Sequence, residues 1–223
     1  MPRCARVDVG GEVYHVLNRA NGRMTIFEND SDYRLFETLL YDTQELTGMR
    51  LLAYVIMPNH FHLALYPQHD GDLGEFMQRL TNSHTRKVHA LTETNGSGHL
   101  YQGRYKSFLV DSDTYLLTLL KYIERNPARA RLADDPASWR WSSAWCREKG
   151  NSKQQAILAE PPTPLPSDYR TWLRTVDKQE DLANIRNAAN RGTPYGRESW
   201  VEHMVTKHRL ESTVRLPGRP RRY

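Results

Sequence analysis

The spacing between two strand-like segments limits the possible folds more than any other feature of this sequence. Residues 51–57 form an unbroken apolar run typical of a buried strand, and residues 60–66 resume a strand pattern after only Pro58 and Asn59. A parallel connection needs a crossover of a dozen or more residues, whereas a two-residue turn suffices for an antiparallel pair. These two segments are therefore predicted to be antiparallel neighbours.

Around this pair, strand-like and helix-like segments alternate through most of the chain. The pattern predicts, in order, a strand, a helix, two strands, a helix, a strand and a helix. The segments are residues 13–18, 31–47, 51–57, 60–66, 73–91, 101–110 and 111–126. This order favours an α+β fold, an antiparallel sheet with flanking helices in a ferredoxin-like arrangement.

The chain is predicted to have three parts. Residues 1–148 are expected to form the main domain. Residues 149–167 contain four prolines within six residues and are expected to be a stiff linker. Residues 168–223 are expected to form a small helical C-terminal extension that ends in a basic tail, with helices near 177–190 and 198–208. Asp177 and Glu180 have the spacing of a capping box at the start of the first of these helices.

Composition excludes several classes of protein. The longest apolar run has seven residues, far below the roughly 20 that span a bilayer, so no membrane segment is expected. The N-terminal segment has no apolar signal-peptide core. Only Cys4 and Cys146 are present, which excludes a disulfide framework and a cysteine-based zinc site. We therefore expect a cytoplasmic protein.

Positive charge is concentrated in the tail. The net charge of the whole chain is +5, and residues 209–223 hold five Arg and one Glu, a local charge of +4. The body is thus close to neutral, and the tail is the part predicted to bind a polyanion.

His60 and His62 lie at the start of a predicted strand. Residues two apart in a strand point to the same face, so the two imidazoles are expected side by side. Two neutral imidazoles can share one divalent ion and leave positions open for phosphate oxygens. Two ordinary strand histidines remain the alternative, because such sites normally have a third ligand.

Tyr115 lies in the first turn of the predicted helix at 111–126, at the edge of its apolar face. The amide groups at a helix N-terminus favour a phosphate or a phenolate nearby. A phenol is a weak nucleophile near neutral pH, but a metal ion on the scissile phosphate would activate the electrophile. The alternative is that Tyr115 and Tyr122 are border residues that only pack their rings.

Several strings resemble the REP-associated tyrosine transposases, which are relatives of the single-tyrosine transposases of small bacterial insertion sequences. The main ones are residues 57–63 (MPNHFHL) and 111–132 (DSDTYLLTLLKYIERNPARARL). Residues 14–16, 101–107 and 141–143 also resemble that family, so the likeness extends over about residues 8–145 in the correct order.

The resemblance implies the HUH nuclease fold and a bacterial enzyme of DNA transposition and recombination. His60 and His62 would bind Mg²⁺ or Mn²⁺, and Tyr115 would attack the DNA phosphate. The products would be a covalent 5′-phosphotyrosine link and a free 3′-OH, which allows strands to be rejoined. The implied substrate is single-stranded DNA folded as the hairpin of a repetitive extragenic palindrome, and the enzyme would act as a monomer or a homodimer.

One position departs from the related insertion-sequence transposases. They have a polar residue one turn after the tyrosine, which completes the metal site, and this chain has Leu119 there. The third ligand is therefore open among Asn126, Glu124, a water molecule and the DNA.

Basic residues are the predicted DNA contacts. Arg104 and Lys106 are expected on one face of the strand before the tyrosine helix. Further candidates are Arg19, Arg125 and Arg129. The tail resembles an AT-hook, whose arginines enter a narrow minor groove, and it adds Arg219, Arg221 and Arg222. Truncation after Ser167 is expected to weaken DNA binding and its salt dependence without abolishing cleavage.

Two other functions are compatible with the sequence. A non-catalytic, sequence-specific DNA-binding regulator would retain the scaffold without the chemistry, and Leu119 supports it. A metal hydrolase would use water as the nucleophile and form no covalent adduct.

Overall fold

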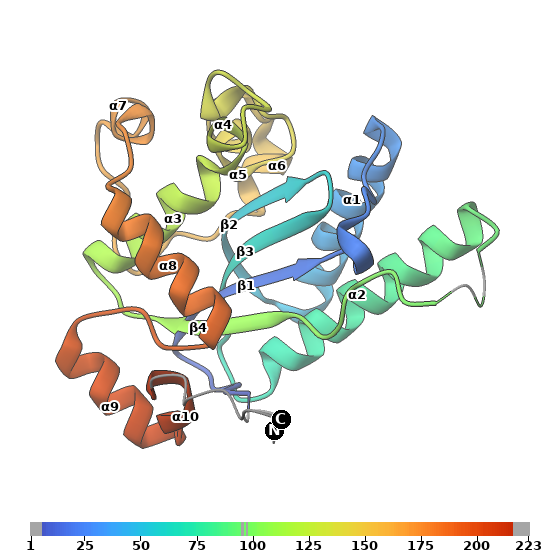
Figure 1. The fold of residues 1–223 in the computed structure, drawn as a ribbon. Helices are drawn as coiled ribbons and strands as arrows, with labels where there is room; N and C mark the ends of the chain where they lie inside the picture. Colours follow the sequence, from blue (N-terminus) through green and yellow to red (C-terminus); the bar gives the residue numbers. More distant parts are fainter. Residues whose placement is uncertain (1–5, 95, 97, 216–223) are drawn as a thin grey trace, which may run out of the picture.

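A four-stranded antiparallel sheet forms the centre of the protein (Figure 1). The computed structural model describes residues 6–94, 96 and 98–215. The strands are β1 (Val13–Arg19), β2 (Arg50–Met57), β3 (His60–Tyr66) and β4 (Lys106–Val110), in the order β2-β3-β1-β4. The predicted antiparallel pairing across Pro58 and Asn59 is confirmed, as is the predicted α+β class.

The three helices predicted in the first part of the chain are present as α1 (Asp30–Thr47), α2 (Asp72–Leu91) and α3 (Thr114–Glu124). The structure adds α4 (Asn126–Arg129), α5 (Ser143–Lys149) and the short 3-10 helices η1 (Asn21–Arg23) and η2 (Pro136–Ser138). Helix α1 begins after Asn29, which forms a capping box with Asp32. It ends at Gly48, whose φ of 66° is the left-handed cap that glycine favours.

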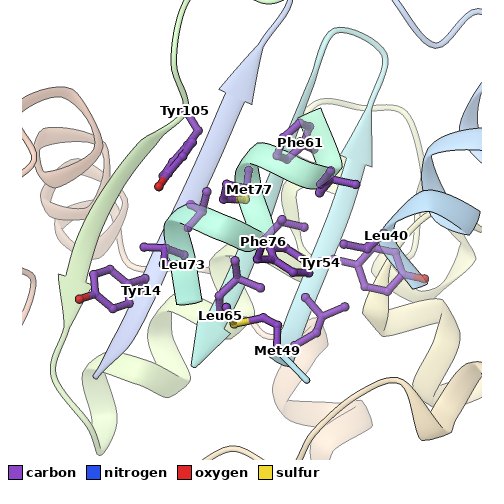
Figure 2. Close-up of a cluster of buried hydrophobic side chains, with 14 of the residues drawn as sticks. Tyr14, Leu40, Met49, Tyr54, Phe61, Leu65, Leu73, Phe76, Met77 and Tyr105 are labelled. Atoms are coloured by element: carbon purple, nitrogen blue, oxygen red, sulfur yellow. The ribbon is translucent and has the colours of Figure 1, made fainter. Parts of the chain in front are cut away.

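Two hydrophobic cores lie on opposite faces of the sheet. On one face, α1 and α2 pack over β1, β2 and β3, and Figure 2 shows Tyr54, Phe61 and Leu65 against Phe76 and Met77 of α2. On the other face, α3 and the C-terminal helix α8 (Gln179–Arg191) cover the sheet. Because side chains alternate along a strand, β3 directs Phe61 into the first core and its two histidines to the second face.

The C-terminal part covers both edges of the sheet. Its other helices are α6 (Ser152–Ala156), α7 (Tyr169–Arg174), α9 (Glu198–His208) and α10 (Glu211–Val214). At the β2 edge, the backbone N–H of Ala159 donates to Leu51 at 2.8 Å. At the β4 edge, Tyr195 pairs in parallel with Val110 and exchanges backbone hydrogen bonds with Leu109 and Asp111. Residues 149–167 and the extension therefore pack on the main domain.

Two local predictions are wrong. The predicted strand at 101–110 is shortened to Lys106–Val110, so Arg104 precedes the strand rather than sharing a face with Lys106. The predicted capping box of Asp177 and Glu180 does not form, because α8 begins after Lys178 and the Asp177 carboxylate binds two arginines instead.

In the described part of the chain, no helix has the length and apolar character needed to cross a membrane.

Candidate active site

His60 and His62 lie side by side on the face of the sheet that α3 and α8 cover. Their ring centres are 5.0 Å apart, and the ring planes are nearly perpendicular at 85°. Both rings line a pocket of about 570 Å³, to which β1, the residues before β4, α3, α4 and α8 also contribute. The predicted proximity of the two imidazoles is confirmed.

A third histidine, His15 of β1, holds the ring of His62. Its Nε2 atom lies 2.9 Å from Nδ1 of His62, and the two rings stack with their planes 5° apart. His15 is fully buried, and its own Nδ1 has no partner among the described residues. Sequence analysis did not select His15, because only the pairing register of β1 and β3 brings it to His62.

Both metal-binding candidates keep one ring nitrogen available. Nδ1 of His60 lies 2.7 Å from Oδ1 of Asn59, and Nδ1 of His62 is bound to His15. The Nε2 atoms of both rings form no hydrogen bond with any residue that the structure describes. Their donor chemistry fits a divalent ion, since a ligating imidazole typically uses one nitrogen for the metal and the other for a hydrogen bond.

Burial keeps these imidazoles neutral. It lowers the pKa of His60 to about 4, helped by the nearby charge of Arg19. Burial also lowers the pKa of His62 well below its ordinary value, with smaller contributions from His15, His60 and Arg129. A neutral imidazole has the free lone pair that a metal ion needs, so both rings are ready to bind one near neutral pH.

Among the side chains left open as a third ligand, Asn126 lies in the right place. It lines the pocket with the two histidines. Glu124 is fully buried elsewhere, where its carboxylate accepts hydrogen bonds from Ser143, Arg147 and Tyr169. No cluster of three or more His, Cys, Asp or Glu residues suited to a metal is found among the described residues, and Asn126 is the side chain from the predicted set that lines the pocket with the histidines.

Tyr122, rather than Tyr115, is the tyrosine beside the histidines. Its ring centre lies 5.9 Å from that of His62 and 6.2 Å from that of His15, and it lines the same pocket. Asn126 follows one helical turn later. Packing of the Tyr122 ring was one alternative from the sequence, and the structure shows that this packed ring also lines the histidine pocket.

Tyr115 lies away from the pocket. It precedes Tyr122 by seven residues, which is about 10 Å along the helix axis. Its ring packs edge-on against Tyr195 of the extension, with ring centres 5.1 Å apart. The expectation that Tyr115 faces the histidine pair is therefore not met in this structure.

Arg129, a predicted DNA contact, is held by contacts within the protein. Its guanidinium lies 4.3 Å from the ring centre of Tyr122 and donates to the Tyr122 carbonyl. The carboxylate of Asp177, which is 9% exposed, holds Arg129 at 3.2 Å and Arg125 at 3.0 Å. Residues just before α8 thus fix a cation against the tyrosine of the pocket.

The remaining predicted cations surround the pocket. Arg19, Arg104 and Lys106 all line it, and their exposed side chains form no ion pair with a described residue. Helix α8 adds Arg186, which sequence analysis missed because nothing local ties α8 to the histidines. Arg219, Arg221 and Arg222 lie outside the described residues.

The chain resembles a known protein family and a solved structure. The family described as "Transposase IS200 like" matches residues 9–126. No curated protein matches the chain. A solved REP-associated tyrosine transposase bound to a REP hairpin is 16% identical, with a TM-score of 0.53 over 64% of this chain and 82% of that one, and it shows the same fold. A putative transposase from Deinococcus radiodurans R1 is 22% identical over 56% of this chain and 95% of that one, with a TM-score of 0.38.

Proposed function

Because the chain belongs to the IS200-like transposase family and is therefore a DNA transposase, we propose that it cuts and rejoins single-stranded DNA through a covalent tyrosine link. One arrangement carries the proposal: two imidazole nitrogens without partners and one phenol line the same pocket. Four exposed cations around it would attract the phosphates of the strand.

The metal site of the proposal uses His60 and His62, with Asn126 as the third protein ligand. Both imidazoles would bind through Nε2, and the proton on Nδ1 of His62 would be donated to His15. A bound Mg²⁺ or Mn²⁺ would withdraw charge from a phosphate oxygen and so make the phosphorus more electrophilic.

We assign the attack to Tyr122, and Tyr115 is the alternative. The Tyr122 oxygen bonds to phosphorus, and its phenol proton is lost to solvent. The bond from phosphorus to the 3′ oxygen breaks, and that oxygen takes up a proton to become a 3′-OH. The 5′-phosphotyrosine retains the phosphoester, so attack by another 3′-OH reverses the step and joins strands without an external energy source.

Arg129 would support this attack. Its guanidinium lies against the Tyr122 ring, and a cation there stabilises negative charge that develops on the phenol oxygen. The Asp177 carboxylate, 3.2 Å from Nη1 of Arg129, would hold the guanidinium in this position.

The substrate class we propose is a DNA hairpin with a single-stranded flank. The similar solved structure is bound to a REP hairpin. In this chain, Arg19, Arg104, Lys106 and Arg186 would hold phosphates near the cut, and the tail would add a second contact with duplex DNA.

A covalent-adduct assay tests the proposal. The full chain is incubated with Mn²⁺ and labelled hairpins taken from palindromes beside its own gene, and then analysed on a denaturing gel. We expect an adduct that Tyr122→Phe cannot form and that Tyr115→Phe still forms. Loss of the adduct in Tyr115→Phe alone would transfer the role to Tyr115. Tight binding without any adduct would favour a non-catalytic regulator, and cleavage without an adduct would favour a hydrolase.

A further inference from the structure

A second groove opens beside the histidine pocket, and we propose that it binds an unpaired nucleotide next to the phosphate that is cut. The groove lies between α2 and residues 98–105 and has a volume of about 730 Å³, within the range of ligand sites. Asn18, Gly103 and Arg104 line both the groove and the histidine pocket, so the two hollows adjoin. This inference rests on the proposed function, because the nucleotide belongs to the strand held at the histidines.

Helix α2 presents a polar stripe to the groove. Gln78, Thr81, Asn82 and Thr85 are spaced as one helical face, and all four line the groove. The two threonine hydroxyls donate to backbone carbonyls one turn earlier, at 2.7 and 2.8 Å. The amides of Gln78 and Asn82 have no hydrogen-bond partner in the described part of the chain.

Uncharged amides suit a base better than a phosphate. Each offers a donor and an acceptor side by side, which matches the edge of a nucleobase, whereas phosphates are bound mainly by cations and N–H groups. Those edges are exposed in a single strand, where bases are read directly. The two amides of the polar stripe therefore suit the edge of an unpaired base.

Tyr105 and Arg6 line the opposite wall of the groove. Tyr105 is only 8% exposed, and its hydroxyl has no partner within the described ranges. The Arg6 guanidinium lies 3.7 Å from the centre of the Tyr105 ring and also lines the groove. Guanidinium planes stack with bases in single-stranded complexes.

Arg104 connects the two hollows. It is exposed, without an ion-pair partner among the described residues, and it lines both of them. A strand whose scissile phosphate lies at His60 and His62 would pass Arg104 before its next base enters the groove. The groove is thus a place where the enzyme reads sequence beside the cut.

A binding cycle tests this inference independently of the chemistry. The full chain is titrated in EDTA, without divalent metal, against fluorescent hairpin oligonucleotides that carry one abasic site at each flanking position in turn. The wild-type chain is compared with Gln78→Ala/Asn82→Ala. The matched control is Asn184→Ala/Asn187→Ala, which removes two exposed amides of α8 that line neither hollow.

We expect the wild-type chain to lose about tenfold in affinity when one particular flanking base is missing. The α2 variant should bind the intact oligonucleotide about tenfold more weakly and lose nothing more at that position, while the control behaves as wild type. Unchanged affinity of the α2 variant would overturn the inference. So would an equal loss at every position, or a loss confined to the duplex stem.

The adduct assay and the binding cycle can fail separately. A loss of affinity at one flanking position without any adduct would support the groove as a nucleotide site and refute the proposed chemistry. An adduct at Tyr122 whose DNA binding depends on no flanking base would support the chemistry and refute the nucleotide site.

Discussion

Replacing Asp177 with asparagine tests how the C-terminal extension is tied to the active site. The carboxylate accepts hydrogen bonds from Nε of Arg125 at 3.0 Å and Nη1 of Arg129 at 3.2 Å. The arginine side chains are 13% and 16% exposed, so the three charges are largely removed from water. Asp177→Asn removes the negative charge and leaves two cations beside one neutral acceptor.

The expected loss of stability follows from these contacts. Breaking a buried ion pair by removing one partner costs about 3–5 kcal/mol. The amide oxygen keeps one hydrogen bond, and both arginines retain a bond to a backbone carbonyl and some exposure to solvent. We therefore expect the free energy of unfolding to fall by about 2 kcal/mol in a urea titration.

The variant should also slow the chemistry. An Arg129 that is no longer held leaves the Tyr122 ring, and a partly desolvated cation against a ring contributes about 1–2 kcal/mol. This predicts roughly 5- to 30-fold slower adduct formation with saturating DNA, while hairpin affinity stays close to wild type. Asp177→Glu, which keeps the charge, should recover most of the rate.

Asp135→Asn is the matched control, because Asp135 pairs with Arg174 where both side chains are 38% exposed. Exposed pairs contribute at most about 1 kcal/mol, so this variant should form the adduct at the wild-type rate. An Asp177→Asn chain that unfolds more easily yet forms the adduct as fast as wild type would refute the link from Asp177 through Arg129 to Tyr122.

Further predictions follow from other contacts. His15→Leu should weaken the binding of Mn²⁺, measured by calorimetry, about 10- to 100-fold. His15→Gln should bind Mn²⁺ more tightly than His15→Leu because it retains a hydrogen-bond acceptor for His62, and equal affinities of the two variants would contradict the role of His15. Burial lowers the pKa of His84 to about 3, so the unfolded chain takes up a proton below about pH 6.5 that the folded chain does not. Stability should be full above that pH and fall toward pH 3, and His84→Gln should reduce the slope by about 1.4 kcal/mol per pH unit; an unchanged slope would count against this assignment. Arg104→Ala and Lys106→Ala should each weaken DNA binding. Each should also reduce the slope of the logarithm of the binding constant against the logarithm of the salt concentration by about one, whereas unchanged slopes would place the DNA elsewhere. Truncation after Ser167 should now reduce cleavage as well as binding, because it removes Asp177 and α8; full cleavage by the truncated chain would contradict the placement of α8 in the site.

The sequence predicted the sheet and its main helices because their signals are local. Helix α2 was expected at 73–91 and spans Asp72–Leu91, since its apolar spacing marks a helix without knowledge of the rest of the fold. Two strands separated only by Pro58 and Asn59 pair antiparallel, because this link is too short for a parallel crossover. The same period of two correctly placed His60 and His62 on one face.

The rest of the site depends on contacts between distant segments. Tyr115 and Tyr122 are seven residues apart, almost two full turns, so both occupy the same helix face and helical periodicity does not rank them. Only folding brings Tyr195 into contact with Tyr115 and places His15 beside Tyr122. Asp177 was predicted to cap a helix, a local role, but its partners are on α3 and α4.

Mapping the covalently modified peptide tests the central claim most directly. The adduct formed with hairpin DNA and Mn²⁺ is digested with nuclease and trypsin and analysed by mass spectrometry. Trypsin cuts after Lys106, Lys121 and Arg125, so Tyr115 falls in residues 107–121 and Tyr122 falls in residues 122–125. We expect the nucleotide on residues 122–125, and a nucleotide on residues 107–121, or on neither peptide, would contradict the assignment of Tyr122 as the nucleophile.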